Sequence, residues 1–274
     1  IKKTIVFPLV PEYVGYADQG IEKDTFVGIP AKCVYYPDNT FKYFIDFEAL
    51  EDYLATHSEV GAMCVSRPTN PTGNVLTNDE IHHLSALAYK YNIPLFVDNA
   101  YGLPFPNIIF TDDAKPYWDS SVILSMSLSK IGLPSLRTGI VVAKAELISA
   151  LSSVNSIVAL ASGSLGQVIS QDLFATGKMK TLAESYVKPF YQQKSLFAQS
   201  CFKEYFAGTN YSVHKSEGAI FNWILMNNLT IPTKELYVKL KDQGVITVPG
   251  EYFFFGTPSH PHYNKCLRIN YSRP

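Results

Sequence analysis

The sequence contains little that would identify a secreted, membrane-spanning or nucleic-acid-binding protein. Its 274 residues include four cysteines, which lie far apart and form no Cys-x-x-Cys pair. This spacing argues against a disulfide framework or a zinc site and fits free thiols in a reducing cytoplasm. No apolar run approaches the length of a membrane span. A net charge of -1 gives no electrostatic footprint for nucleic acid or for an anionic membrane.

The length and composition of the chain are those of a globular protein. Hydrophobic residues make up 47% and charged residues 17%, so the chain can bury a sizeable core in one large and one smaller domain. Residues 46–56 have apolar side chains at helical spacing, and Thr77 to Glu80 form a capping-box pattern that opens a second helix. Because strand and helix patterns alternate with short connections, the sequence predicts βαβ units and a parallel sheet.

The sequence also predicts where one domain ends. A helical period runs through residues 179–206 and is interrupted at Pro189, where a helix would kink or restart. We therefore expect a large domain over residues 1–188 and a small domain over residues 189–274. Strands are expected at residues 4–9 and 32–36, and buried strands at residues 122–124 and 140–143. Small-domain strands are expected at residues 212–214, 220–226, 245–248 and 267–271.

Three polar segments each follow an apolar strand pattern. They are residues 66–73, residues 98–102 and residues 125–139. Because open α/β sheets bind ligands at the carboxyl ends of their strands, these segments should meet at one edge. The third segment combines hydroxyls and an arginine, which bind phosphate well, with Lys130. At a strand end Lys130 can be partly desolvated, so its ammonium can lose a proton more easily than in water.

Each segment also has an ordinary explanation. An isolated Ser-x-Ser-Lys is more often a surface loop, and Asn-Pro-Thr-Gly at residues 70–73 could be only a turn. Asp98 is harder to explain in that way, because a carboxylate placed directly after a buried strand needs a cationic partner. The three segments together therefore favour a binding site.

These segments resemble the pyridoxal phosphate (PLP) aminotransferases of fold type I. The family motifs N-P-T-G, D-x-A-Y and S-x-S-K are matched at residues 70–73, 98–101 and 127–130. The resemblance implies an α/β fold, with a three-layer large domain around a mostly parallel sheet and a smaller α+β C-terminal domain. It also implies that PLP is the cofactor and that each matched residue has a defined role.

The implied roles are as follows. Lys130 would bind the cofactor covalently and act in catalysis, and Asp98 would pair with the protonated ring nitrogen. Asn70 and Tyr101 would hydrogen-bond the phenolic oxygen, and the ring of Tyr13 would stack on the pyridine. The phosphate would be held by Ser127, Ser129 and Arg137. Arg268, in Leu-Arg-Ile-Asn, would bind the substrate carboxylate with Asn70 beside it.

Longer stretches are similar to the valine–pyruvate aminotransferase branch, among them residues 7–18, 65–75, 98–106 and 214–221. The resemblance implies transamination between valine or alanine and the corresponding 2-oxo acids, by a cytoplasmic homodimer. Its partners would be small amino and 2-oxo acids, with no nucleic acid and no membrane. Lys130 and Arg137 are seven positions apart, one fewer than in the aspartate aminotransferase pattern. We expect this to move the turn and leave the roles unchanged.

Compared with the family, the N-terminal part of the large domain and the end of the small domain are expected to lie outside these residues. Two other functions remain open. One is a different PLP reaction on the same fold, such as a β-lyase or a decarboxylase. The other is a non-catalytic, PLP-binding regulatory domain, which should come with a basic helix-turn-helix region that this sequence does not contain.

Two histidine pairs, at residues 82–83 and 260–262, could suggest a metal site. No acidic or cysteine partner stands at ligand spacing, so surface histidines and no metal are expected. Residues 253–255 are three phenylalanines, for which a core position and a place beside the substrate are equally compatible.

Overall fold

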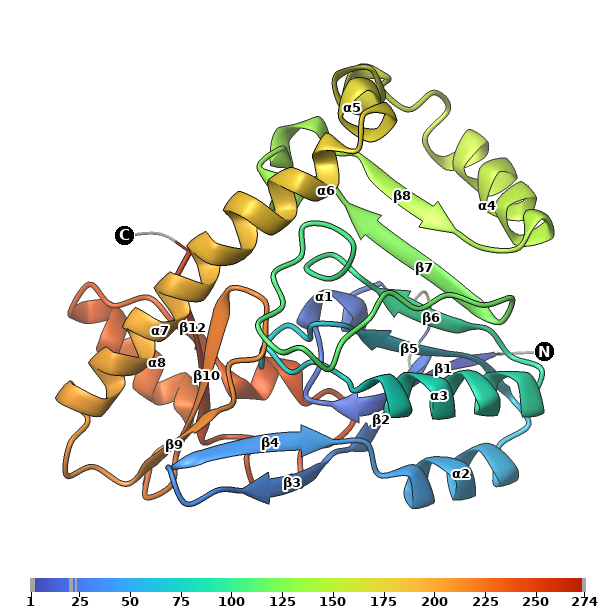
Figure 1. Ribbon diagram of the computed structural model, residues 1–274. Helices are drawn as coiled ribbons and strands as arrows, with labels where there is room; N and C mark the ends of the chain where they lie inside the picture. The colour runs from blue at the N-terminus through green and yellow to red at the C-terminus, as the bar shows by residue number, and fades with distance from the viewer. Residues whose placement is uncertain (1–2, 20–21, 23, 273–274) are drawn as a thin grey trace.

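The computed structural model describes residues 3–19, 22 and 24–272, and in this part of the chain two six-stranded sheets form the framework (Figure 1). Neighbours in the first sheet are parallel except for the last pair, as the sequence predicts. In spatial order its strands are β2 (Phe26–Pro30), β1 (Thr4–Val10), β5 (Val60–Ser66), β6 (Leu95–Asp98), β7 (Val122–Ser127) and β8 (Gly139–Val142).

Helices α2 (Phe47–Thr56) and α3 (Asn78–Lys90) supply apolar side chains to the same core as the first sheet. Both helices begin with a side-chain cap, and the one at Thr77 is the capping box predicted from sequence. The Asp46 side chain accepts from the Ala49 amide, and Thr77 and Glu80 form a complete capping box. These bonds use amides at the helix start that have no partner inside the helix. The caps therefore fix where each helix begins over the sheet.

The second sheet combines strands from the two ends of the chain. Its strands are antiparallel except for β4 and β9, which are parallel. In spatial order they are β11 (Val248–Pro249), β12 (Cys266–Asn270), β10 (Phe221–Met226), β9 (Tyr211–His214), β4 (Thr40–Phe44) and β3 (Lys32–Tyr35). The domain boundary between residues 188 and 189 stays a prediction. It would assign β3 and β4 to the large domain, although they belong to the same sheet as β9 to β12.

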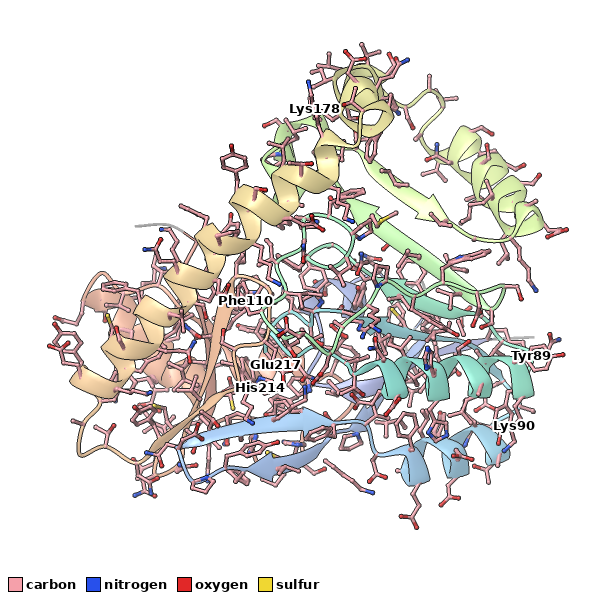
Figure 2. The ribbon with its side chains drawn as sticks, viewed as in Figure 1. Tyr89, Lys90, Phe110, Lys178, His214 and Glu217 are labelled. Carbon is pink, nitrogen blue, oxygen red and sulfur yellow. The ribbon has the colours of Figure 1, made fainter. Side chains whose placement is uncertain are left out.

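An ion pair between Lys42 on β4 and Glu217, which follows β9, also binds Val75 in the loop after β5 of the first sheet. The Lys42 ammonium donates to the Glu217 carboxylate and to the Val75 carbonyl, 3.0 Å away. His214, three residues before Glu217 and labelled with it in Figure 2, accepts from the Tyr43 amide at 3.2 Å. Burial lowers the pKa of His214 to about 3, so its imidazole is neutral. These contacts place β4 and β9 side by side.

Six further α-helices complete the part of the chain that the structure describes. They are α1 (Val14–Ala17), α4 (Ala145–Val158), α5 (Leu165–Ala175), α6 (Lys178–Leu182), α7 (Lys188–Tyr205) and α8 (Thr233–Asp242). Figure 1 shows α6 and α7 as one long helix that runs from the β8 end of the first sheet toward the second sheet. A π-helical turn at Ala183–Val187 joins them, and Pro189 lies in the first turn of α7 rather than at a break.

Three expectations need correction. The strand at Ile140 was expected to be buried, but β8 is the antiparallel last strand of its sheet and its residues are mostly exposed. His262 is not on the surface, because it is only 5% exposed and contacts the hydroxyls of Tyr35 and Tyr43 at 2.7 and 2.6 Å. The strand expected at residues 245–248 is reduced to the two residues of β11.

The described cysteines are all free thiols, and the described residues contain no cluster of three metal-ligating side chains. Among the described helices, none is long and apolar enough to cross a membrane. Of the three phenylalanines, Phe253 and Phe254 are fully buried in the core.

Candidate active site

The predicted site residues follow three neighbouring strands of the first sheet. Ser66 at the end of β5 pairs with Asp98 at the end of β6, and Asp98 pairs with Ser125 near the end of β7. Because these strands are parallel, the loops that follow them open at the same edge of the sheet. The sequence prediction that the three polar segments meet is confirmed.

A cavity of about 180 Å³ lies at this edge. It brings together five of the residues predicted from sequence, namely Tyr13, Asn70, Asp98, Tyr101 and Lys130, which line it with Ser66, Pro68 and Ala100. The lining offers one amine, one carboxylate, one amide and two phenols. Such a set can hold a small aromatic molecule that carries both a positive ring nitrogen and an oxygen substituent.

The Asp98 carboxylate is held by groups on both sides. Its Oδ1 accepts from the Ala100 amide at 3.0 Å and from the Ser125 hydroxyl at 3.5 Å. Its Oδ2 accepts from the hydroxyl of Tyr16 on α1 at 2.5 Å. In the described residues no lysine or arginine forms an ion pair with Asp98. A half-buried carboxylate with neutral donors only is suited to a cationic ligand.

Lys130 lies in a short 3₁₀ turn, Ser129–Ile131, directly after β7. Its ammonium is 5.5 Å from the centre of the Tyr101 ring. Partial burial, and then the positive charges of Arg137 and Arg268, lower the pKa of Lys130. A lysine with a lowered pKa releases its proton more easily and becomes a nucleophile or a base.

Arg268 reaches the site from β12 of the second sheet. Its Nη1 donates to Asn70 Oδ1 at 2.7 Å, and its guanidinium lies over the rings of Phe221 and Phe253, 4.4 and 5.2 Å from their centres. Its Nε is buried without a hydrogen-bond partner in the described residues. A buried donor without a partner is costly, so this guanidinium is prepared to receive an acceptor.

The three predicted phosphate ligands are less closely gathered. Ser127 accepts from the Ser129 amide at 3.1 Å, so these two lie in one turn beside Lys130. Arg137 has a left-handed backbone with φ of 48°, and its exposed side chain donates to the Pro134 carbonyl at 3.4 Å. All three are outside the lining of the cavity that contains Lys130. Arg137 is nevertheless near enough to Lys130 to lower its pKa.

The Asn-Pro-Thr-Gly turn brings Asn70 to Arg268. The Gly73 amide donates to the Thr69 carbonyl at 2.9 Å, and Gly73 has φ of 72°. A Cβ atom on Gly73 would lie 2.7 Å from the Gly218 carbonyl oxygen, so only glycine fits this turn against the second sheet. The turn is therefore more than a surface connection, because it joins the two sheets at the site.

Sequence reasoning missed the residues behind Asp98. They are Glu12, Tyr16 and Ser66, which form hydrogen bonds with one another or with Asp98. The only local signal was Glu12 itself, an acid placed directly after the buried strand β1. The same argument that singled out Asp98 applies to it.

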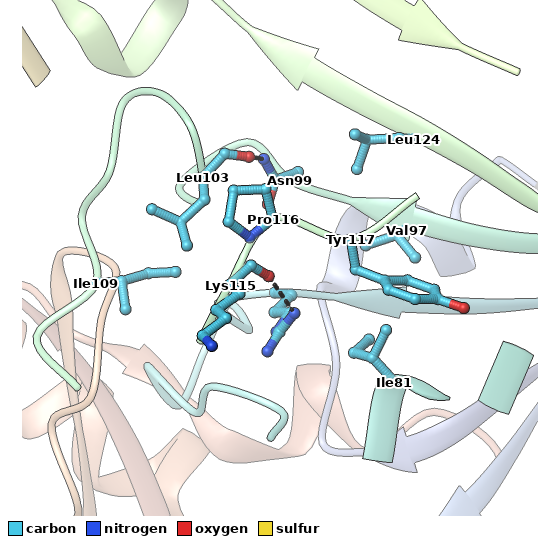
Figure 3. A pocket seen from close by; sticks show the side chains of 10 residues that line it. Ile81, Val97, Asn99, Leu103, Ile109, Lys115, Pro116, Tyr117 and Leu124 are labelled. Carbon is cyan, nitrogen blue, oxygen red and sulfur yellow. Dashed lines mark hydrogen bonds between the residues drawn. The ribbon is translucent and has the colours of Figure 1, made fainter. Parts of the chain in front are cut away.

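A second cavity, shown in Figure 3, is not a candidate site. It has a volume of about 20 Å³ and lies among Ile81, Val97, Leu103 and Tyr117, with the polar side chain of Asn99 bonded to the Leu103 carbonyl. A space of this size holds about one water molecule. Neither Lys130 nor Asp98 lines it.

Comparison with known proteins gives a consistent result. The family profile "Aminotransferase class I and II" matches residues 23–274. Valine–pyruvate aminotransferase of Escherichia coli K12 is 44% identical over 270 residues, which are 98% of this chain and 64% of that protein. The chain thus spans somewhat less than two thirds of the length of this relative.

Two solved structures are similar over nearly the whole chain. A valine–pyruvate aminotransferase from Salmonella typhimurium LT2 has a TM-score of 0.91 and 43% identity, covering 99% of this chain and 68% of that one. A putative amino-acid aminotransferase from Psychrobacter arcticum has a TM-score of 0.94 and 44% identity, covering 98% and 63%. With the fold and the profile match, these findings show that the chain belongs to the class I and II aminotransferases, which have the type I PLP fold.

Proposed function

We propose that this protein is a PLP-dependent aminotransferase that transfers the amino group between a small aliphatic amino acid and a 2-oxo acid, valine or alanine with pyruvate or 2-oxoisovalerate. One observation carries the proposal. One cavity is lined by a lysine of lowered pKa and, in the described residues, by a carboxylate without a cationic partner. Asn70 of the same lining accepts a hydrogen bond from Arg268, whose Nε has no partner among the described residues. Family membership implies PLP as the cofactor.

The residues of the cavity fit PLP in their chemistry. Asp98 would pair with the protonated ring nitrogen, and Tyr101 and Asn70 would hydrogen-bond the phenolic oxygen. Tyr13, which lines the cavity and is 37% exposed, would stack on the ring. Lys130 would carry the cofactor covalently. When bound, PLP supplies an electron-withdrawing ring that stabilises negative charge at the substrate α-carbon.

Ser127, Ser129 and Arg137 are the proposed phosphate ligands. Hydroxyls and a guanidinium match phosphate oxygens, and the three belong to the turns on either side of Lys130. Since Arg137 is exposed and bonded only to a carbonyl of its own turn, its side chain is available to an anion.

Lys130 is the proposed acid–base group. As a free neutral amine, Lys130 would accept the proton from the substrate α-carbon and hold it during the transfer. Burial and the two nearby guanidinium groups favour this neutral amine because they disfavour the ammonium form. Arg268 would hold the substrate carboxylate in place during the transfer.

The substrate preference follows from what the cavity lacks. Apart from Lys130, its described lining contains no lysine or arginine that could bind the side-chain carboxylate of aspartate or glutamate. Arg268 is needed for the α-carboxylate. Small aliphatic side chains are therefore the proposed donors, in line with the names of the two valine–pyruvate relatives.

We further propose that the protein acts as a cytoplasmic homodimer. The arm formed by α4 and α5 has large apolar side chains on its surface, including Ile157, Val158 and Leu160, which are 78, 80 and 84% exposed. Contiguous apolar surface of this kind is typical of an interface. Free cysteines are compatible with a reducing compartment.

Borohydride reduction with PLP, followed by peptide mapping, tests the central assignment. The pyridoxyl group should be found on Lys130, and Lys130→Ala should abolish the label. Lys194→Ala, on α7, is the matched control and should keep it. Label on any other lysine of the wild-type protein contradicts the proposal.

The two other functions left open by the sequence are tested by products. A β-lyase would release ammonia and a decarboxylase carbon dioxide, whereas an aminotransferase returns a new amino acid for each 2-oxo acid consumed. A regulatory domain would bind PLP at Lys130 without turnover. Formation of alanine from pyruvate in proportion to valine consumed supports transamination and excludes both other functions.

A further inference from the structure

A line of hydrogen bonds connects Asp98 to a second, fully buried carboxyl group. The Tyr16 hydroxyl donates to Asp98 Oδ2 at 2.5 Å and lies 3.4 Å from Ser66 Oγ. Ser66 Oγ is in turn 2.8 Å from Glu12 Oε1. The residues come from β6, α1, β5 and the segment after β1, so no single element explains their meeting. The proposed transamination uses Asp98 and leaves the other three without a role.

Glu12 is 1% exposed and has only neutral donors around it. Its Oε1 contacts the Tyr13 amide at 2.8 Å, and its Oε2 contacts the Ser66 amide at 3.0 Å. Burial, opposed by these bonds and reinforced by the charge of Asp98, raises the pKa of Glu12 from 4.5 to about 8. The other titratable groups facing it are Tyr16 and the buried thiol of Cys64, and neither supplies positive charge.

The protonation of Glu12 decides how the hydrogens along the line are arranged. If Glu12 is ionised, Ser66 must donate to it and Tyr16 donates to Asp98, so no hydrogen lies between Ser66 and Tyr16. If Glu12 carries a proton on Oε1, it donates to Ser66, Ser66 donates to Tyr16, and Tyr16 donates to Asp98. All bonds then point toward the Asp98 carboxylate, and each strengthens the next.

Tyr16 is a dependable donor in this line. Burial, together with the charges of Asp98 and Glu12, raises the pKa of the Tyr16 phenol well above its usual range. Its ring lies between those of Phe7 and Tyr13. The Phe7 ring is stacked on it with the ring centres 5.2 Å apart, and the Tyr13 ring is edge-on with the centres 5.3 Å apart. The hydroxyl is therefore held in one position between Ser66 and Asp98.

We propose that Glu12, Ser66 and Tyr16 are positioning residues that hold the Asp98 carboxylate toward the cavity, and that the proton on Glu12 sets the direction of their hydrogen bonds. With Glu12 neutral, Asp98 is the single negative charge of the group and is available to the cofactor ring. Ionisation of Glu12 turns the Ser66 hydroxyl from Tyr16 toward Glu12, so the hydrogen bond from Tyr16 to Asp98 becomes weaker. It also adds a second buried negative charge. The inference rests on the proposed function because that function gives Asp98 its cofactor role.

The test follows both carboxyl groups directly by NMR. Protein labelled with ¹³C at the side-chain carboxyl carbons is titrated from low to high pH without cofactor or substrate, and signals are assigned with Asp98→Asn and Glu12→Gln. The Glu12 signal should titrate with a midpoint near pH 8. The Asp98 signal should move at the same midpoint, because the two groups share one line of hydrogen bonds.

Two variants cut the line at different bonds. In Tyr16→Phe and in Ser66→Ala, Glu12 should still titrate while the movement of the Asp98 signal at that midpoint falls severalfold. In Glu12→Gln the movement should vanish, because the amide has no proton to lose; its NH2 group must face either the Tyr13 or the Ser66 backbone amide, so one of these two hydrogen bonds is given up at every pH. An Asp98 signal that does not move in the wild type, or that moves as far in both variants as in the wild type, overturns the proposal.

Stability gives a second readout. Because the folded pKa of Glu12 lies above its unfolded value, the folded state binds the extra proton, and stability from this group is lost as pH rises from 4.5 toward 8. The unfolding constant of the wild type should rise by up to about tenfold per pH unit relative to Glu12→Gln. Glu204→Gln, an exposed acid at the end of α7, should match the wild type.

Equal pH profiles for the wild type and Glu12→Gln would show that Glu12 is not held neutral and would overturn the proposal. None of these measurements uses PLP or turnover, so their outcome is separate from the labelling of Lys130. A failed label with an intact Asp98 titration refutes the proposed function alone. A successful label with an uncoupled Asp98 refutes the positioning role alone.

Discussion

Replacing Arg268 by alanine should lower kcat/KM for every amino and 2-oxo acid substrate by a similar factor. All of them present one carboxylate, and Arg268 is the group that we propose to receive it. The guanidinium is half-buried between two phenylalanine rings, and its Nε has no other partner in the described chain. Since a desolvated guanidinium–carboxylate pair is strong, the loss should be large.

Its magnitude can be estimated from pairs of this kind. Truncating one partner of a buried, hydrogen-bonded charge pair costs roughly 2–5 kcal/mol. At about 1.4 kcal/mol for each factor of ten, this corresponds to a decrease of roughly 30- to 5,000-fold in kcat/KM. The lower half of this range is expected, because Arg268 is not fully buried. Arg268→Lys should fall between the wild type and alanine, since lysine keeps the charge but loses the planar fork.

The assay is the single-turnover half-reaction, followed through the absorbance of the cofactor. Valine, alanine and aspartate are compared on one preparation of each variant, with pyruvate for the reverse direction. Lys239→Ala, on the exposed side of α8, is the control and should leave all rates unchanged. Urea unfolding of Arg268→Ala is measured alongside, because loss of the contacts with Phe221 and Phe253 should itself cost about 1 kcal/mol.

Two results would refute this reasoning. One is a decrease of less than about threefold for all substrates, which would correspond to an exposed ion pair rather than a desolvated one. The other is a large decrease for aspartate with none for valine and alanine. That result would show that Arg268 binds a side-chain carboxylate, and the proposed preference for aliphatic donors would be wrong as well.

Three further predictions concern other parts of the chain. Asp98→Asn should retain PLP but reduce the single-turnover rate by about 10²- to 10³-fold, because a neutral amide cannot stabilise the protonated ring; an unchanged rate would contradict its role. Thr77→Ala should lower the free energy of unfolding by about 1 kcal/mol through loss of the capping box, as measured in urea. Replacing Ile157 and Val158 by glutamate should lower the mass found by light scattering from dimer to monomer, and an unchanged mass would exclude this arm from the interface.

Much of the first sheet could be predicted because its signals are local. The capping box of Thr77 and Glu80 lies in the first turn of the helix that it begins, and the structure contains it. The strand β4 was missed because Lys42 interrupts its apolar pattern. Only the structure shows that this lysine is buried against Glu217, a residue far along the chain.

The same distinction applies to the site. Asn70, Asp98, Tyr101 and Lys130 stand in short motifs, and the structure gathers them in one cavity. The residues behind Asp98 stand in no motif. Tyr16 and Asp98 are 82 positions apart, so their contact depends on the packing of α1 over the sheet. No local pattern could have predicted it.

The parallel pairing of β4 with β9 affects the order in which the molecule can assemble during synthesis. Thr40 pairs with Val213, so the hairpin of β3 and β4 cannot join its sheet until most of the chain has been synthesised. Such distant pairing is slow and leaves strand edges exposed to other chains in the meantime. Cleavage of the chain between the two halves of this sheet would therefore not release two self-sufficient pieces, because each would carry an edge that only the other can cover.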